Sequence, residues 1–227
     1  MSERLADRTV VDAYDRWARP YAALSANAPL LARFRRRAVE ALALDEGDVA
    51  VDVGCGPGDN LAHLARAVGP DGTVVGVDAS AGMLRAAARR DLAPVQLVRG
   101  DAASPSVAGP VDGVLSTFVV TLFEDPGAVV DAWWSRLGPG GHLALLNLAP
   151  ARGTLARALN LGLAAGLALS TPTREALDRP LLVELDRRVT AAHRSLADRA
   201  VRVHHHEAFG GAVRIAVGVN ADGRDQP

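Results

Sequence analysis

The chain has 227 residues, of which 49% are hydrophobic, enough to close one sizeable core. Its 25 basic and 26 acidic residues nearly cancel, so no overall field favours nucleic acid, and the expected partner is a small molecule. The N-terminal MSERLADRTV carries charges where a secretory signal needs an apolar core, and the single cysteine, Cys55, cannot form an internal disulfide. We therefore expect a cytoplasmic protein.

Two helical patterns, residues 9–19 and 29–44, come first, and they predict a helical cap over residues 1–44. From Asp48 onward, short Val-rich runs alternate with longer Ala/Leu/Arg stretches, the pattern of a parallel sheet covered by helices. The expected strands are residues 49–53, 73–78, 95–99, 111–118 and 142–148. The expected helices between them are residues 59–68, 81–91 and 127–137, with connections marked by GPDG, DLAP and LGPGG.

The last third of the chain has a different pattern. Residues 154–199 have helical spacing and lie within a predicted helical insertion, 150–199. Two strands, 201–209 and 212–219, then follow around Gly210-Gly211, a hairpin signal that makes one of them antiparallel. The predicted fold class is α/β: a single domain over 1–227, built on a doubly wound, seven-stranded, mostly parallel sheet with a C-terminal antiparallel hairpin.

Residues 51–60, VDVGCGPGDN, lead from the first strand into three glycines set at every second position. In an open α/β sheet the ligand crevice lies beyond the carboxyl ends of the strands. Gly54 and Gly56 permit close backbone approach, and Gly58 opens a helix. A dinucleotide site has G-x-G-x-x-G, whereas here the spacing is G-x-G-x-G and Asp52 and Asp59 would repel a pyrophosphate. A cationic ligand fits better.

The second and third strands both end in acids. Asp78 lies about 20 residues beyond Gly58, the usual distance for an acid that accepts hydrogen bonds from ribose hydroxyls. Asp101 follows the third strand and is well placed to accept a hydrogen bond from an exocyclic amine such as that of adenine. Ribose, amine and positive charge together indicate S-adenosylmethionine.

The ordered segments VDVGCGPGD, VVGVDAS, VRGDA, VDGVLSTF and LGPGGHLALLN resemble the motif series of class I S-adenosylmethionine-dependent methyltransferases. The resemblance covers residues 45–148, and the closing hairpin is similar to the last two strands of that family. Residues 14–21, YDRWARPY, are similar to the Y-D-x-x-A-x-x-Y-D segment of the quinone-biosynthesis C-methyltransferase branch, with Ala22 in place of its second acid.

The resemblance implies that cofactor-binding residues follow four successive strands. Asp78 would hold the ribose, Met83 would pack on the adenine, and Ser116 would border the reacting centre. Cys55 would line the loop, since no neighbouring base is evident that would make it a nucleophile. The full implied set is Asp52, Gly54, Cys55, Gly56, Gly58, Asp59, Asp78, Ala79, Met83, Asp101, Ala102, Ser116 and Thr117.

Catalysis of this kind needs little acid/base machinery. A sulfonium methyl is already electrophilic, so orientation alone can contribute roughly 7 to 11 kcal/mol. Tyr14 and His193 are the weak candidates for a catalytic group; their alternatives are a tyrosine packed on the core and a histidine on a solvated helix face. Successive rings of residues 204–206, HHH, would alternate across a strand and could not converge on one ion, so we predict no metal site.

Two further segments leave alternatives open. Residues 154–169 are apolar nearly all round but too short to span a bilayer. They predict a lid over the carboxyl edge of the sheet, a wall for a lipid-like or quinone acceptor, or a surface that meets a membrane. Arg33, Arg35, Arg36 and Arg37 form a dense basic cluster, for which we favour a solvated face over contact with anionic headgroups or a charged acceptor.

The leading hypothesis is a small-molecule methyltransferase that uses S-adenosylmethionine, with S-adenosylhomocysteine as product, and acts on a quinol, phenol, amine or lipid-like acceptor. Two alternatives are an NAD(P)-dependent oxidoreductase on a Rossmann sheet and a non-catalytic S-adenosylmethionine-binding module. The G-x-G-x-G spacing and the acid after the glycines count against the oxidoreductase.

Overall fold

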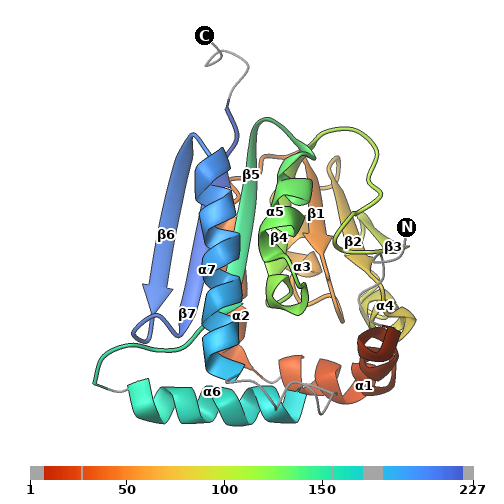
Figure 1. Ribbon diagram of the computed structural model, residues 1–227. Helices are drawn as coiled ribbons and strands as arrows, with labels where there is room; N and C mark the ends of the chain where they lie inside the picture. Colours follow the sequence, from red (N-terminus) through yellow and green to blue (C-terminus); the bar gives the residue numbers. More distant parts are fainter. Residues whose placement is uncertain (1–7, 27, 155, 171–180, 222–227) are drawn as a thin grey trace.

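The computed structural model describes residues 8–26, 28–154, 156–170 and 181–221, which form one sheet flanked by helices (Figure 1). The seven strands are ordered β3-β2-β1-β4-β5-β7-β6. They are β1 (Val49–Val53), β2 (Thr73–Asp78), β3 (Val95–Arg99), β4 (Val111–Thr117), β5 (Leu137–Leu148), β6 (Arg202–Ala208) and β7 (Val213–Val219). The first five are parallel, whereas β7 is antiparallel to both β5 and β6. The predicted fold class is confirmed.

Helices cover both faces of this sheet. The buried residues of α5 and α7, among them Trp133 and Leu196, pack on one face, while Phe34 and Leu64 of α2 and α3 belong to a second apolar cluster. The helices are α1 (Arg8–Ala26), α2 (Pro29–Glu40), α3 (Leu61–Val68), α4 (Ala81–Ala88), α5 (Pro126–Trp134), α6 (Ala156–Ser170) and α7 (Leu181–Arg199), with a 3₁₀ turn η1 (Val120–Leu122) after β4.

The element bounds differ from the sequence expectations where local signals compete. The strand predicted from residue 142 begins at Leu137, because Leu137 pairs with Val111 before the register shifts. Glycines that look like a turn thus belong to an irregular strand. The first helix continues through Pro20 to Ala26, well beyond residue 19. Of the predicted helical region 154–199, residues 155 and 171–180 lie outside the described parts of the chain.

Two helices lie across the edge of the sheet at which the parallel strands end. Figure 1 shows α1 and α6 along the lower edge, toward which the arrow of β6 points. Leu163 of α6 packs against Ala149, Leu185 and Val189, so α6 is anchored to α7 and to the end of β5. Whether residues 154–169 act as a lid, as a wall for the acceptor or as a membrane-contacting surface stays a prediction. Among the described residues, no helix is both long and apolar enough to cross a membrane.

Candidate functional site

A pocket lies at the carboxyl edge of the sheet, between α1 and the loops that follow β1, β2, β3 and β4. Most of the residues predicted to bind a cofactor meet there: Gly54, Cys55, Gly56, Asp59, Asp78, Ala79, Met83, Asp101, Ala102 and Thr117. The lining residues that were not predicted as cofactor-binding are Val11, Tyr14, Tyr21, Arg35, Pro57, Ser80, Phe118, Val119, Leu122 and Phe123. Segments far apart in sequence therefore build one cavity.

The glycine-rich loop leaves bare backbone at the pocket. Gly54 and Gly56 have φ of 67° and 54°, in the left-handed region that favours glycine. A Cβ on Gly54 would lie 2.5 Å from Cγ2 of Val119, whereas a Cβ on Gly56 would meet nothing within 4 Å. Gly54 N and Cys55 N both donate to the carbonyl oxygen of Val77, at 2.8 and 3.0 Å, which fixes the loop on β2. A ligand can therefore approach the backbone at Gly56 closely.

Asp78 joins this loop to the start of α4. One carboxylate oxygen accepts a hydrogen bond from Gly56 N and the other from Ser80 N, each at 2.8 Å. Ser80 in turn caps α4, since its Oγ accepts from Met83 N at 3.1 Å. Burial raises the pKa of Asp78, and the two backbone hydrogen bonds oppose that rise. Each carboxylate oxygen keeps a further lone pair for a donor from a ligand.

The loop after β3 is held from behind. Asp101 Oδ1 accepts from Ala103 N at 2.9 Å, and the carbonyl of Ala102 accepts from Nε1 of the buried Trp133 at 2.6 Å. Trp133 comes from α5, so the helix on one face of the sheet fixes a pocket loop. Asp101 and Ala102 are thus held at the pocket without using the backbone N–H of Ala102.

Three residues of the predicted set lie behind the pocket. Asp52 is fully buried, and Asn60 Nδ2 lies 3.1 Å from both of its carboxylate oxygens. Gly58 packs on α3 and α4: a Cβ at this position would lie 2.8 Å from Cδ1 of Leu61 and 3.1 Å from Cβ of Ala87. Ser116 Oγ is buried without a hydrogen-bond partner among the described residues. These positions support the loop from below and do not line the cavity.

The buried Asp52 is harder to ionise than an aspartate in water. Burial raises its pKa to about 7, although the hydrogen bond from Asn60 and the charge of Arg35 act in the opposite direction. Asn60 Nδ2 also lies 3.0 Å from Thr117 Oγ1, so the β1 loop is tied to the end of β4. A proton on Asp52 would avoid an uncompensated charge at this place.

Arg35 corrects the interpretation of the basic cluster. Arg33, Arg36 and Arg37 are exposed as expected, but Arg35 is buried and lines the pocket. Its guanidinium donates to Thr117 Oγ1 at 3.1 Å and lies 5.0 Å from the ring centroid of Phe118. Helical spacing could have predicted the burial of Arg35, since Arg35 lies on the same face of α2 as the buried Ala38.

Asp59 is compensated by two arginines. Arg35 Nη2 lies 3.6 Å from Asp59 Oδ2, and Arg90 forms a second ion pair with Oδ1. Ser25 of α1 donates to the same carboxylate. The sequence argument that Asp59 presents a free negative charge is therefore too simple, because long-range packing brings cations to it.

Replacing Arg35 by methionine is expected to lower the free energy of unfolding by about 2 kcal/mol, because the buried polar atoms of Thr117 and Asn60 lose their donor. Arg90 still compensates Asp59, which keeps the loss below that of a fully broken pair. Urea denaturation measures it. The matched control is Arg33→Met, an exposed position of the same helix, and equal stability of the two variants would contradict the buried role of Arg35.

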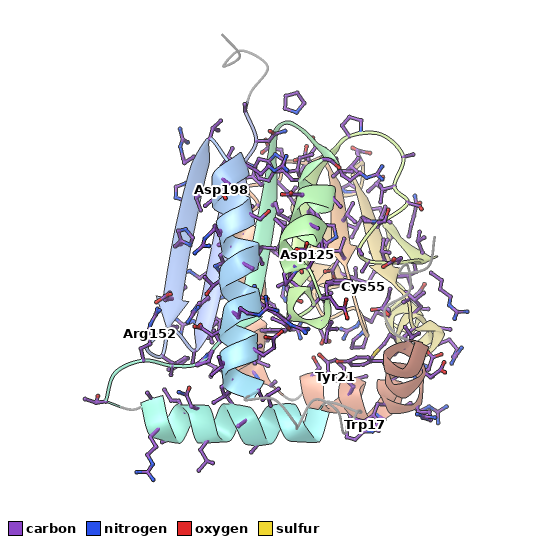
Figure 2. The ribbon with its side chains drawn as sticks, in the orientation of Figure 1. Trp17, Tyr21, Cys55, Asp125, Arg152 and Asp198 are labelled. Atoms are coloured by element: carbon purple, nitrogen blue, oxygen red, sulfur yellow. The ribbon has the colours of Figure 1, made fainter. Side chains whose placement is uncertain are left out.

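Two tyrosines of α1 face the pocket. Tyr14 and Tyr21 have their ring centroids 6.2 Å apart in an edge-to-face arrangement. In Figure 2, Tyr21 lies between α1 and the sheet edge, with Trp17 farther out. Burial raises the pKa of Tyr14 to about 12, and Tyr21 and Asp78 add to the rise. The Tyr14 hydroxyl is therefore protonated at neutral pH and is able to donate a hydrogen bond. Tyr21 follows Tyr14 by seven residues, a spacing that places both rings on the same face of a helix, so the sequence could have indicated Tyr21 as well.

The structure does not bring His193 to the pocket. His193 is packed between α7 and the sheet, with Nε2 3.3 Å from Asn147 Nδ2 and its ring centroid 6.2 Å from that of His205. Burial, together with the nearby His205 and Arg214, lowers the pKa of His193 to about 4. The interpretation as a solvated residue is wrong, because the apolar stripe of α7 carries His193 inward.

The remaining reactive groups are also placed by packing. Cys55 is buried, and burial raises the pKa of its thiol, which keeps it protonated. The ring centroid of His206 lies 6.4 Å from that of Phe34, so His206 is on the side of the hairpin that faces α2. Within the described ranges, no three His, Cys, Asp or Glu side chains are grouped to hold a metal ion.

The strand order, the glycine-rich loop and the acids at successive strand ends define a Rossmann-like nucleoside-binding protein. Residues 50–141 match the family model described as "Methyltransferase domain". Trans-aconitate 2-methyltransferase of Methylobacterium radiotolerans is 31% identical over 207 residues, which cover 81% of this chain and 79% of that protein. The chain belongs to the class I S-adenosylmethionine-dependent methyltransferases, whose cofactor is S-adenosylmethionine.

Other relatives match over shorter segments. Nocamycin O-methyltransferase of Saccharothrix syringae is 41% identical over 105 residues, 44% of this chain and 38% of that protein. Demethylmenaquinone methyltransferase of Staphylococcus saprophyticus is 34% identical over 117 residues, half of each chain. The chain thus spans less than two thirds of both. The solved structure of the plantazolicin methyltransferase BpumL with S-adenosylhomocysteine has the same fold, with a TM-score of 0.60, 12% identity and coverage of 93% and 96%.

Proposed function

We propose that this chain transfers a methyl group from S-adenosylmethionine to a small, apolar acceptor. The observation that carries the proposal is the pocket itself. It combines Asp78, Asp101 and the bare backbone at Gly56 with an apolar wall that includes Leu122 and Phe123. One part suits an adenosyl group, and the other suits an acceptor with little charge.

The residues present fit the cofactor. The open space at Gly56 leaves room for a ligand against the backbone, and Asp78 has lone pairs for the ribose hydroxyls. Asp101 and the Ala102 N–H would read the adenine edge, with Met83 packed against the ring. Among the lining residues that the structure describes, Arg35 is the only cation, and it would face the carboxylate of the methionine part.

Methyl transfer here needs orientation more than proton transfer. The bound cofactor supplies an electrophilic methyl group. The chain's part is to hold the acceptor in line and exclude water, for which Tyr14, Phe118 and Val119 line the cavity. Because the pKa of Tyr14 is about 12, Tyr14 would orient the acceptor as a hydrogen-bond donor. The acceptor would then use a lone pair that is already available, or lose its proton to water.

The acceptor class is argued from the wall of the pocket. The names of the relatives give trans-aconitate, nocamycin and demethylmenaquinone, so this family serves acceptors of different chemistry. Val11, Leu122 and Phe123 favour a quinol, phenol, amine or lipid-like acceptor over a polyanion. A cytoplasmic setting stays our expectation, as does contact of α6 with a membrane surface that could deliver a lipid-like acceptor.

Calorimetry with S-adenosylhomocysteine and with NAD tests the proposal. We expect the first to bind and the second not to bind, because the loop has the G-x-G-x-G spacing and not the G-x-G-x-x-G of a dinucleotide site. A panel of quinols, phenols, amines and phospholipids, with S-adenosylhomocysteine formation as readout, then identifies the acceptor. Binding of NAD alone would overturn the proposal, and cofactor binding without turnover on any panel member would favour a binding module.

A further inference from the structure

A second groove lies on the other side of the contact between α1 and α4. Its volume is about 310 Å³. Its walls carry four arginines, two from α1, one from α4 and one that caps the C-terminus of α4, together with the acid and the glycine at which the helices meet: Arg16, Arg19, Arg85, Arg89, Asp15 and Gly82. All four arginines are exposed. Nothing in the proposed methyl-transfer reaction uses this groove.

The two helices meet closely beside the groove. A Cβ on Gly82 would lie 2.8 Å from the carbonyl oxygen of Asp15 and 3.1 Å from Cβ of Ala18, so only glycine allows this approach. Asp15 Oδ1 accepts a hydrogen bond from Gly82 N at 2.8 Å and another from Ser80 Oγ. Asp15 therefore fastens α1 to the first turn of α4.

This contact is also a wall of the cofactor pocket. Tyr14, next to Asp15, and Met83, next to Gly82, both line that pocket. Ser80 links the contact to Asp78, whose carboxylate accepts from Ser80 N. Any ligand that tightens α1 on α4 would thus hold Tyr14 and Met83 in place around the cofactor.

The charges across the contact do not balance. Among the lining residues that the structure describes, Asp15 is the only acid, and it already accepts hydrogen bonds from Ser80 and Gly82. None of the four arginines forms an ion pair within the described ranges of the chain. An anion with several oxygens can bridge arginines of both helices, because guanidinium forks match phosphate geometry.

We propose that this groove binds a phosphate-bearing anion that bridges α1 and α4 and thereby strengthens cofactor binding. The coupling part rests on the proposed function, whereas anion binding by itself does not. Linkage requires the effect to be reciprocal, so the cofactor must also tighten anion binding by the same factor. The phosphate could belong to a free pyrophosphate-like anion or to a lipid headgroup, and the experiment separates these sources.

The experiment uses the full chain and a double variant, Arg16→Gln with Arg85→Gln, which removes one arginine from each helix. The matched control, Arg33→Gln with Arg37→Gln, removes the same charge from exposed positions of α2. Inorganic pyrophosphate is titrated by calorimetry without cofactor. The affinity for S-adenosylhomocysteine is then measured with and without saturating pyrophosphate.

We expect pyrophosphate to bind the wild type and the control and to tighten S-adenosylhomocysteine about fivefold in both, near the lower end of typical couplings. The double variant should lose pyrophosphate binding and the coupling, but keep its anion-free cofactor affinity within about twofold. Two results would rule out a free anion as the ligand: no pyrophosphate binding by the wild type, or the same pyrophosphate affinity in the wild type and the double variant.

Vesicles provide the second arm. Sedimentation with phosphatidylglycerol vesicles, compared with neutral phosphatidylcholine vesicles, tests the headgroup as the source of phosphate. Arginine-dependent binding to anionic vesicles without pyrophosphate binding would assign the groove to a lipid, and failure in both arms would refute the site. Failure of S-adenosylhomocysteine to bind any variant would refute the proposed function while leaving the pyrophosphate titration as an independent test of the groove.

Discussion

Replacing Asp78 and Asp101 together with asparagine is expected to weaken S-adenosylhomocysteine binding by roughly 100- to 1,000-fold at neutral pH. Hydrogen bonds to a charged acceptor contribute about 1.5 to 3 kcal/mol each. Losing one such bond at each residue, in the lower part of that range, costs about 3 to 4 kcal/mol, and every 1.4 kcal/mol is a factor of ten in Kd. Calorimetry measures the affinities directly.

Asp78 adds a second reason for a large effect. Its two oxygens accept from Gly56 N and Ser80 N, so an asparagine must place an NH₂ group against one of these donors. The glycine-rich loop or the start of α4 would then shift away from the ligand. Asp78→Asn alone is therefore expected to lose more affinity than Asp101→Asn alone, whose backbone partner is the single N–H of Ala103.

Asp112→Asn is the matched control for this pair. Asp112 lies at the amino end of β4, where its carboxylate accepts from Val49 N at 2.8 Å, on the edge opposite the pocket. The same chemical change there should leave cofactor affinity within about twofold. If the double variant kept wild-type affinity with its fold intact, the assignment of the two acids to the ribose and the adenine would be wrong.

Local sequence pattern is enough to predict which strand-end residues meet at the pocket, although their role in binding stays a prediction. Parallel strands end at one edge of a sheet, so Asp78 and Asp101 could be placed together from strand positions alone. The bounds of β1, β2 and β3 agree with the predicted ones because each is a short Val-rich run with clear turn signals on both sides.

The parts that the sequence does not predict depend on long-range packing. Arg35 and Tyr21 reach the pocket only because α2 packs on a face of the sheet and α1 lies across its edge, and no local signal shows this arrangement. A helical period shows that one face is buried but does not say against what, so His193 is read as solvated although it faces β5. Leu137 joins β5 because it finds a partner in Val111, despite the glycines that follow.

The pH dependence of stability is expected to contain two opposing contributions. The pKa of Asp52 is raised by burial from 3.8 to about 7 in the folded protein. Folded molecules then keep a proton that unfolded molecules release as the pH rises from about 4 to 7, so this group makes stability fall with rising pH. About three pKa units correspond to a contribution on the order of 4 kcal/mol.

His193 acts in the other direction. Burial lowers its pKa from 6.5 to about 4, so folded molecules keep a neutral ring that unfolded molecules protonate as the pH falls. Its contribution is fully present above pH 6.5 and is lost on acidification toward pH 4. The size is about 2 to 3 kcal/mol, since the side chain keeps some contact with solvent. Between pH 4 and 6.5 the two slopes largely cancel in the wild type.

Single variants should separate the two slopes. Asp52→Asn leaves the His193 slope, so its free energy of unfolding should rise with pH between 4 and 6.5. His193→Gln leaves the Asp52 slope, so its stability should fall steadily from pH 4 to 7. Urea denaturation across a pH series measures both, and subtracting each variant from the wild type removes the groups that all the proteins share.

His204→Gln controls for the loss of a histidine, because His204 is an exposed residue of β6 on the same hairpin as His205. A difference between wild type and Asp52→Asn that stays constant from pH 4 to 7 would mean that Asp52 is ionised in the folded protein. The proton assigned to it beneath the glycine-rich loop would then be wrong, and Asn60 and Arg35 would have to stabilise a buried carboxylate between them.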